Sequence, residues 1–426
     1  MKSRFCGSAR LLTMVLAATV VLPATARGDW HVATVESGGE VGGSPSLAID
    51  AEGNSHVAYV DYTLGCLKYA KRVGDAWETQ IVDTRMPYYP SLAVDSQGRP
   101  HVAWCTPGGL LYSHWTGTQW QTETAVSGGM VGAIVPPALA LTTADEPRIA
   151  YYINDGTGCW LGYATPAEPA WATTIIAWHG LSGCRPALAL DANDNPRIAW
   201  AWEWSMGCSL FYYSFDAGVW SNEYVAECGL CASGLAPALA LDSSGDAHVF
   251  TTLDGVLSHR QRTAAGWQFD IIADDVVNSN AAVLDAFDHP HVAYYRWYAD
   301  CLKYAHRTTS SWCIQTADDS GPDDVGYTPS IAVDADGIPH IAYRDRTHED
   351  LKYTWWEPTV IVGDLNCDGC VGFGDINLFV LYLANFEAWW ASFPNCLPAN
   401  GDINGDGAYP SFRDINPFVV LLSSMD

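Results

Sequence analysis

Oxygen-bearing side chains stand at alternate positions in a short segment near the C-terminus, GDLNCDGCVGFGDIN. They are Asp364, Asn366 and Asp368, and Asp375 follows seven residues later. Alternate spacing lets one turning loop aim several oxygens at a hard cation such as calcium, and a glycine at the sixth position, here Gly369, permits the sharp turn. The segment therefore predicts a calcium site.

A second segment, GDINGDGAYPSFRDIN, repeats this pattern with Asp402, Asn404 and Asp406. Its twelfth position is Arg413 and Asp414 stands thirteenth, so this loop holds one residue more than the first. A bulged loop would still bring Asp414 to the cation. The sequence leaves open whether a second calcium ion binds here, and a pair of acidic, glycine-rich turns without metal is the alternative interpretation.

A second group of residues could bind a ligand. These residues lie in segments whose sequence varies from one copy of a long internal repeat to the next; the repeat itself is described below. Aromatic rings stack on the faces of sugars, while carboxylates and guanidinium groups bind hydroxyls. We expect such residues to line a binding surface on loop tips, although ordinary polar loop tips have a similar composition. The expected ligand-binding residues are Trp202, Glu203, Trp204, Arg296, Trp297, Arg344 and Asp345. If the ligand is an acidic polysaccharide, Arg296, Arg344 and Arg346 would bind its carboxylate or sulfate groups.

Catalysis at the same surface would need a carboxylate pair, or a set of histidine, tyrosine and arginine, converging at one pocket. The candidates are Glu203 with Asp345 and Arg296 with His348. The chain carries no GxSxG or HExxH motif. A glycoside hydrolase or polysaccharide lyase is therefore the alternative to a non-catalytic binding protein.

A repeat occupies most of the chain and must position these residues. Its clearest copies read PSLAVDSQGRPHVAW (90–104), PALALDANDNPRIAW (186–200) and PSIAVDADGIPHIAY (329–343). Neighbouring copies lie between 43 residues (242 to 285) and 51 residues (191 to 242) apart. A near-constant period of this size indicates a repeat architecture. The aligned acidic or hydroxyl positions are Asp50, Asp95, Thr142, Asp191, Asp242, Asp285 and Asp334.

Each repeat predicts four antiparallel strands. Glycine or aspartate three residues after the aligned position suits a tight hairpin between two β-prone runs. A histidine or arginine follows at the sixth position in every copy, which indicates a structural role at this turn. A tyrosine and, eight residues later, a tryptophan mark a second hairpin, as in Tyr69 and Trp77. Four-stranded units of this length predict an all-β, seven-bladed propeller.

The seventh repeat lacks its fourth strand, because Trp355 and Trp356 follow Tyr353 without room for a turn. A matching strand, WHVATVE, begins at Trp30, before the first repeat. We expect residues 30–36 to complete the last blade and close the ring, which would leave only short, protected strand edges. An open β-solenoid is the alternative.

The ends of the chain complete the domain prediction. Residues 1–26 have the basic start, apolar core and Ala-Thr-Ala end of a secretory signal peptide, with an uncleaved anchor as the alternative. We expect the propeller to span 27–357 and a small helical module with the paired loops to span 358–426. No other segment is apolar enough to span a membrane, so the protein is predicted to be secreted or held at the cell surface.

Charge and cysteine content narrow the range of partners. The formal net charge is −27 and no basic cluster is long enough to follow a phosphate backbone, which argues against nucleic acid. The twelve cysteines that follow the signal peptide predict disulfides in an exported protein. The sterically plausible pairs are Cys66–Cys105, Cys159–Cys184, Cys208 with Cys228 or Cys231, and Cys367–Cys396.

The duplicated loop and apolar run (363–383 and 401–422) resembles a dockerin module, whose calcium loops carry Asp at the twelfth position. The resemblance implies a calcium-dependent module that binds a cohesin-like or cell-surface protein. It also implies an association with polysaccharide breakdown. The blades loosely resemble those of sialidase-like propellers, but the SxDxGxTW boxes of that family are absent. We therefore expect an exported propeller that binds a glycan or protein ligand and is tethered by this module, with a carbohydrate-active enzyme as the alternative.

Overall fold

The computed structural model has two compact units, Gly28–Glu357 and Pro358–Asp426, and each is described by itself. The predicted signal peptide at 1–26 lies outside the described residues. The described residues are 28–127, 137–154, 158–179, 182–183, 185–204, 207–228, 237–253, 255–274, 279–307, 312–358, 360, 362–365, 371–393 and 396–423.

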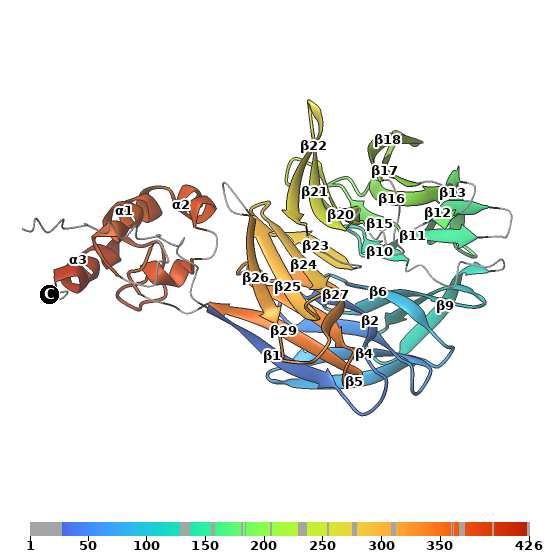
Figure 1. Ribbon diagram of the computed structural model, residues 1–426, viewed down its shortest axis with the longest axis horizontal. Helices are drawn as coiled ribbons and strands as arrows, with labels where there is room; N and C mark the ends of the chain where they lie inside the picture. The colour runs from blue at the N-terminus through green and yellow to red at the C-terminus, as the bar shows by residue number, and fades with distance from the viewer. Residues whose placement is uncertain are drawn as a thin grey trace, which may run out of the picture. The chain divides into compact units, whose positions relative to one another are not determined.

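The first unit consists of seven antiparallel sheets arranged as the blades of a propeller, as the sequence predicted (Figure 1). We number the blades 1 to 7 along the chain by their inner strands. Each inner strand contacts the inner strands of both neighbouring blades, and the inner strand of blade 7 contacts that of blade 1. The inner strands are β2 (Gly43–Ile49), β6 (Tyr88–Val94), β10 (Ala138–Leu141), β15 (Ala187–Leu190), β19 (Ala238–Leu241), β23 (Asn280–Leu284) and β27 (Val325–Val333).

The remaining strands follow outward in each blade. The second strands are β3 (Ser55–Asp61), β7 (Pro100–Thr106), β11 (Pro147–Asn154), β16 (Pro196–Trp204), β20 (Ala247–Leu253), β24 (Pro290–Arg296) and β28 (Pro339–Asp345). The third strands are β4 (Cys66–Val73), β8 (Gly109–Trp115), β12 (Cys159–Thr165), β17 (Gly207–Asp216), β21 (Val256–Thr263), β25 (Cys301–Arg307) and β29 (Asp350–Pro358). The outer strands are β5 (Ala76–Asp83), β9 (Trp120–Ser127), β13 (Ala172–His179), β18 (Val219–Cys228), β22 (Gly266–Ala273), β26 (Trp312–Asp318) and, from the start of the chain, β1 (Gly28–Glu36). A short strand, β14 (Ser182–Gly183), also pairs with β16.

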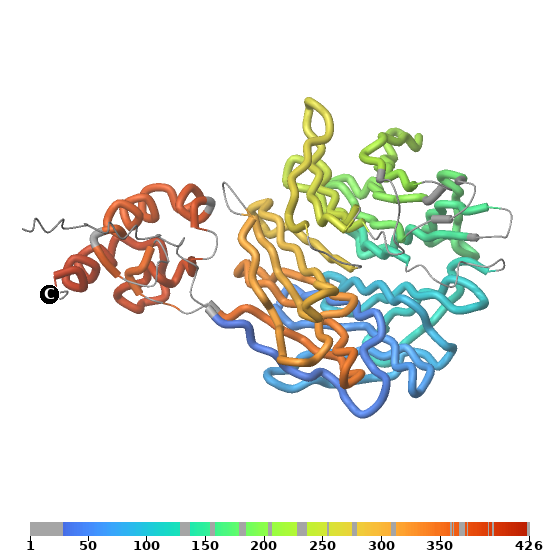
Figure 2. The backbone as a smooth tube through the Cα atoms, in the orientation of Figure 1, coloured from blue at the N-terminus to red at the C-terminus, as the bar shows by residue number. Residues whose placement is uncertain are grey.

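The ring is closed by the N-terminal strand, which confirms the prediction from the incomplete seventh repeat. Strand β1 pairs with β29 at the edge of blade 7, and Figure 2 shows the blue first strand running beside the orange last strand. Lys352 Nζ of β29 donates to Thr34 Oγ1 of β1 at 2.9 Å. The open solenoid is therefore excluded.

One aromatic contact repeats between neighbouring blades. The tryptophan at the outer strand of each blade meets, edge-on, an aromatic ring on the third strand of the preceding blade, with centroids 5.0 to 5.8 Å apart. Trp30 makes the contact with Tyr304 at 5.1 Å, so β1 supplies the seventh copy. Each such pair contributes about 0.5–1.5 kcal/mol beyond the area that it buries. The other pairs are Trp77–Tyr353, Trp120–Tyr69, Trp171–Tyr112, Trp220–Tyr163, Trp267–Tyr212 and Trp312–His259.

The turn between the inner and second strands is held by the residues that recur at fixed spacing. In blade 1, Asp50 Oδ1 accepts from the Asn54 amide at 2.8 Å, and Asp50 Oδ2 lies 2.9 Å from His56 Nε2. The other ring nitrogen of His56 lies 2.6 Å from the Tyr69 hydroxyl. Gly53 supplies the left-handed residue of the turn at φ +82°. The histidine therefore links the turn to the third strand, in the structural role that its repetition indicated.

The second unit is small and helical. Its elements are η1 (Phe373–Asp375), α1 (Ile376–Ala384), α2 (Phe386–Ser392), η2 (Pro398–Gly401), η3 (Phe412–Asp414) and α3 (Ile415–Ser423). The rings of Phe379 and Phe418, which hold equivalent places in α1 and α3, meet in the core with centroids 4.4 Å apart. Neither unit has, among its described residues, a helix long and apolar enough to cross a membrane.

Two of the predicted disulfides are wrong. Cys66, Cys105 and Cys159 are free thiols, as are Cys301 and Cys313. Cys105 packs in the hydrophobic cluster of its own blade, and the Cys159 sulfur lies 2.7 Å from the Tyr152 hydroxyl, so burial within a blade takes the place of cross-linking. Of the other predicted pairs, Cys208 and Cys228 lie directly opposite each other on β17 and β18, and that pairing stays a prediction.

Replacing Trp30 by alanine tests the closing contact. Because this ring is half-buried, we expect Trp30→Ala to lower the free energy of unfolding by about 2 kcal/mol, less than the roughly 3–5 kcal/mol of a fully buried tryptophan. Tyr298→Ala, at a side chain that is 92% exposed, should change it by less than about 0.5 kcal/mol. Chemical denaturation of both variants measures the difference, and equal losses would contradict the role of Trp30.

Candidate functional site

The segments between the second and third strands, such as 62–65 in blade 1 and 346–349 in blade 7, lie at one end of the strands, and we call this end of the ring the loop face. Here the Arg344 guanidinium lies over the Tyr62 ring, 5.5 Å from its centroid. Its Nη2 donates to Glu40 Oε1 at 2.9 Å. The Arg344 side chain is 15% exposed and that of Glu40 is 45% exposed. The Nε of Arg344 has no hydrogen-bond partner among the described residues, so a strong donor is left unsatisfied.

A second arginine of blade 7 lies over a ring of its own blade and a ring of blade 6. The Arg346 guanidinium lies 4.9 Å from the Tyr327 ring centroid and 5.9 Å from that of Trp297. Its Nη1 donates to Asp324 Oδ2 at 2.8 Å. We call Tyr62, Trp297, Tyr327, Arg344 and Arg346 the aromatic–arginine surface. The structure brings together three of the predicted binding residues here, Trp297, Arg344 and Arg346.

The loop-face ends of the inner strands adjoin this surface, since Tyr327 of β27 pairs with Arg344 of β28. Burial raises the pKa of Tyr89, while the Arg185 guanidinium opposes that rise and the Tyr327 hydroxyl adds to it, so these groups lie within electrostatic reach of one another. Burial lowers the pKa of Arg185 to about 10. Tyr89 and Thr328, each preceding the proline of an inner strand, have φ of +50° and +48°. Ser44 holds the same place in blade 1 with φ of +48°, so this conformation is a repeated feature of the inner strands in blades 1, 2 and 7.

Asp345 and His348 order the loop of blade 7. Asp345 is buried, and its Oδ1 accepts from the amides of Thr347 at 2.9 Å and His348 at 3.0 Å. Its Oδ2 lies 3.0 Å from His348 Nδ1, and this hydrogen bond raises the pKa of His348. His348 Nδ1 contacts Asp345 and, at 3.8 Å, Asp323, so His348 is not brought to the predicted partner Arg296. Asp345 therefore shapes the loop instead of presenting free oxygens to a ligand.

The predicted loop tip of blade 4 belongs to a strand. β16 runs to Trp204, and its last residues pair with β17. Trp202 is half-buried against the hydrophobic cluster between blades 3 and 4. The side chains of Glu203 and Trp204 lie outside the described residues. Alternating aromatic residues favour a longer strand, which is why the residues predicted to form a loop tip extend β16 instead. Arg296 likewise ends a strand, β24, opposite Cys301.

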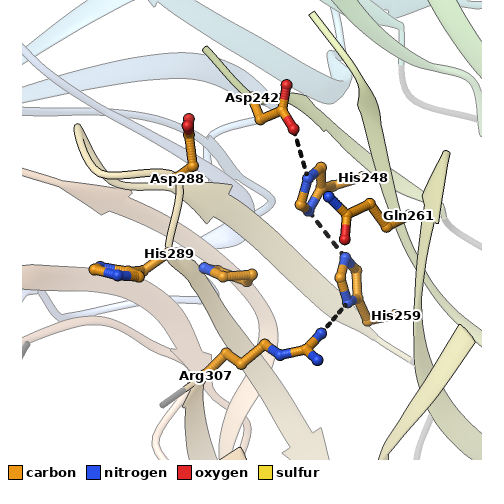
Figure 3. A pocket seen from close by; sticks show the side chains of 8 residues that line it. Asp242, His248, His259, Gln261, Asp288, His289 and Arg307 are labelled. Atoms are coloured by element: carbon orange, nitrogen blue, oxygen red, sulfur yellow. Dashed lines mark hydrogen bonds and ion pairs between the residues drawn. The ribbon is translucent and has the colours of Figure 1, made fainter. Parts of the chain in front are cut away.

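A pocket of about 250 Å³ opens at the opposite end of the strands from the loop face, where the inner and second strands turn. Residues of blade 5 line one side and residues of blade 6 line the other (Figure 3). The lining residues are Asp242, His248, His259, Gln261, Asp288, His289, Pro290 and Arg307.

A chain of polar contacts runs along this pocket (Figure 3). His248 Nε2 lies 3.4 Å from Asp242 Oδ2, and His248 Nδ1 lies 3.0 Å from His259 Nε2. His259 Nδ1 lies 3.4 Å from Arg307 Nη1. Burial, together with the neighbouring His248 and Arg307, lowers the pKa of His259 to about 3, so this imidazole stays neutral. His259 therefore takes part in this chain of contacts without a positive charge.

Sequence reasoning did not assign this pocket. The signal was present, because His259 stands where the other repeats carry a tyrosine. A residue that differs from its counterparts in the other repeats can have a role other than packing. That role depends on the side chains of the neighbouring blade, which the repeat pattern does not show.

The paired loops of the second unit are partly described, since Asn366 and Asp368 lie outside the described residues. In the first loop, the buried Asp375 accepts from the amides of Leu365 and Gly372, both at 2.8 Å. Asp364 is buried beside it.

In the second loop, Asp414 is buried, and its Oδ1 accepts from the Asn404 amide at 2.9 Å. Its Oδ2 has no hydrogen-bond partner among the described residues. Asp402 accepts from the amides of Asp406 and Gly407 at 3.0 and 2.9 Å. The described residues contain no group of three or more His, Cys, Asp or Glu side chains arranged to hold a metal. The extra residue therefore leaves Asp414 bound to the loop at the Asn404 amide, while Arg413 Nη1 lies 3.5 Å from Asp406 Oδ2 of the same loop.

Comparison with known proteins supports the fold. No family model matches the chain, and no curated protein is similar to it in sequence. Among solved structures, polysaccharide lyase Uly1 is 9% identical, with a TM-score of 0.50 over 74% of this chain and 90% of that chain. The Cps50 (Swd1) β-propeller domain of Myceliophteria thermophila is 12% identical, with a TM-score of 0.49 over 76% of this chain and 99% of that chain. SapL1 lectin in complex with alpha methyl fucoside is 13% identical, with a TM-score of 0.45 over 65% of this chain and 97% of that chain. At these identities the likeness concerns the propeller fold alone.

The neutral buried histidines predict a fall in stability in mild acid. The pKa of His259 and of His306 is lowered to about 3 in the fold, against about 6.5 in the unfolded chain. Their contribution is therefore complete above pH 6.5 and is lost as the pH falls towards 3, because the unfolded chain binds the protons. We expect each to remove roughly 2 kcal/mol between pH 6.5 and 5.

Chemical denaturation at several pH values measures this slope. His306→Gln should make the free energy of unfolding depend less on pH in this range. A slope unchanged by that substitution would show that His306 is protonated in the folded protein.

Proposed function

We propose that the propeller binds a neutral polysaccharide at the aromatic–arginine surface and is held at its place of action by the C-terminal unit. The observation that carries the proposal is the Arg344 guanidinium, buried against the Tyr62 ring with its Nε unsatisfied and its charge balanced by the half-exposed Glu40. A sugar ring stacked beside the 40% exposed Tyr62 ring would bind the half-exposed Glu40 carboxylate through its hydroxyls.

The arginines of this surface led us to consider an acidic ligand from the sequence. Because these arginines are paired with carboxylates in the structure, a neutral ligand is favoured instead. Arg344 and Arg346 are each paired with a carboxylate, Glu40 and Asp324. The chain as a whole has a formal net charge of −27, which repels polyanions at a distance. Paired guanidinium and carboxylate groups bind hydroxyls through both donors and acceptors, while the rings bind the apolar face of a sugar.

The tether proposal rests on the buried carboxylates of the paired loops. A carboxylate oxygen buried without a partner, as in Asp414, is costly unless a cation or donor satisfies it. Asp402, Asn404 and Asp406 stand at the alternate positions that calcium loops use. The second loop would then hold calcium through these residues and Asp414, and the first through Asp364, Asn366, Asp368 and Asp375.

The proposed setting follows from both ends of the chain. A signal peptide at 1–26 would export the protein, and a calcium-ordered module of the dockerin type would bind a cohesin-like or cell-surface protein. The propeller would then retain a polysaccharide close to that partner. This arrangement assigns the propeller a binding role, and catalysis remains the alternative.

Polysaccharide binding is tested with exposed rings of the surface. Trp297 and Tyr62 are 46% and 40% exposed, so their replacement by alanine should leave the fold intact. A stacking ring is worth on the order of 1 kcal/mol, so we expect each variant to bind a neutral polysaccharide, first identified on a glycan array, about fivefold more weakly. Phe269→Ala, at a 66% exposed ring on β22, is the matched control and should bind like the parent.

Salt and turnover separate the alternatives. Binding of a neutral glycan should change little between about 0.05 and 0.5 M salt, whereas an acidic glycan would be released as salt rises. Array hits confined to acidic glycans, or equal losses in Phe269→Ala and Trp297→Ala, would overturn the proposal. Release of new chain ends from the bound polysaccharide would favour the enzyme.

Calcium binding is tested by calorimetric titration of the full chain. We expect Asp414→Asn to bind one calcium ion fewer than the parent, because the substitution removes the charged oxygen that faces the second loop. Glu387→Gln, at an exposed carboxylate on α2, should bind as many ions as the parent. Absence of calcium uptake by the parent, or an unchanged number of ions in Asp414→Asn, would contradict the assignment.

A further inference from the structure

Blade 5 departs from the other blades at the pocket between blades 5 and 6. In the other six blades an alanine of the second strand stands opposite a tyrosine of the third, as Ala58 stands opposite Tyr69. In blade 5 this pair is Phe250 and His259, whose rings stack with centroids 4.7 Å apart. The exchange keeps the core filled by Phe250 and places an imidazole at the pocket wall, where its two nitrogens contact His248 and Arg307.

The turn carboxylate of blade 5 differs from those of blades 1, 2, 4 and 6, as does that of blade 7, where Ile338 stands four residues after Asp334. In blades 1, 2, 4 and 6, the Oδ2 of the turn aspartate lies within hydrogen-bond distance of the side chain four residues later. In blade 5 that residue is Asp246, which has no proton to donate when ionised. Asp242 Oδ2 instead meets His248 Nε2 at the long distance of 3.4 Å. An acceptor with incomplete hydrogen bonding therefore lines the pocket.

Donors line the same space. Arg307 is 38% exposed and forms an ion pair with Asp270, so its guanidinium brings donors to the pocket without an unbalanced positive charge. Gln261 adds an amide, and Pro290 adds an apolar wall. Asp242 and Asp288 make the pocket unfavourable for an anion.

We infer that this pocket is a second binding site, which takes one neutral sugar residue. Adjacent hydroxyls of a sugar ring are each donor and acceptor, and they match a carboxylate oxygen on one side and guanidinium and amide donors on the other. The volume of about 250 Å³ suits one ring and not a polysaccharide chain. The inference does not rest on the proposed function, because the pocket and the aromatic–arginine surface lie at opposite ends of the strands.

The first test restores the repeat. The double substitution Phe250→Ala with His259→Tyr recreates the pair found in the other six blades and removes the His259 imidazole from the pocket. Calorimetric or saturation-transfer titration of the full chain with methyl glycosides of neutral hexoses should detect binding in the parent. In the double variant we expect at least a tenfold loss of affinity with an unchanged or higher melting temperature.

Two matched single variants test hexose binding without changing the core residues Phe250 and His259. Asp242→Asn replaces the pocket acceptor by an amide donor and should weaken hexose binding about tenfold. Asp334→Asn makes the same change at the equivalent turn of blade 7, where Oδ2 lies 3.1 Å from His340, and should leave hexose binding unchanged. Equal effects of the two variants, or a double variant that binds like the parent, would overturn the inference.

The sugar panel and a loop-face variant complete the design. A methyl uronoside should bind more weakly than the neutral hexoses, because Asp242 and Asp288 repel its carboxylate. Tyr62→Ala should bind hexoses like the parent even though it binds the polysaccharide more weakly. The two binding proposals can therefore be contradicted independently of each other. Absence of binding by every neutral hexose, or binding confined to the uronoside, would overturn the inference.

Discussion

The contact on which the propeller depends is the edge-on meeting of a tryptophan of one blade with an aromatic ring of the blade before it. Each blade is a twisted sheet whose faces must be covered by its neighbours, and this contact fixes how one sheet lies on the next. The ring closes because Trp30, from the start of the chain, makes the same contact with Tyr304 that the other blades make in sequence. A closed ring removes long free edges and gives a rigid scaffold on which loops vary without loss of the fold.

Much of this architecture could be predicted because its signals are local. The turn built around Asp50 and His56 uses residues six apart, and its repetition gives the number of blades directly. Closure could be predicted because the strand missing after Tyr353 matched the strand beginning at Trp30. Contacts between blades could not be predicted in the same way. The period pairs Tyr69 with Trp77 in one repeat, whereas the structure places Trp77 against Tyr353.

The candidate sites were harder to predict because they arise where neighbouring blades meet. Arg344 was expected at the surface, but its stacking on Tyr62 and its bond to Glu40 join segments some three hundred residues apart. In blade 4, the tryptophans expected on a loop extend a strand, because their aromatic character suits a sheet as well as a sugar. The cysteine pairs failed for a related reason, since Cys105 is buried in the core of its own blade. A departure from the repeat, such as His259, is visible in the sequence. Its contact with Arg307 of the next blade is not, and so its role could not be predicted.

Both proposed sites follow one pattern: the repeated residues hold the ring together, and the residues proposed to bind ligands lie where a blade departs from the repeat. A crystal structure of the full chain grown with fragments of the polysaccharide that it binds tests this central claim most directly. The account predicts a sugar ring stacked beside Tyr62 or Trp297 within hydrogen-bond distance of Glu40. Sugar density over the outer strands, or at the turns that all blades share, with the aromatic–arginine surface empty, would contradict it.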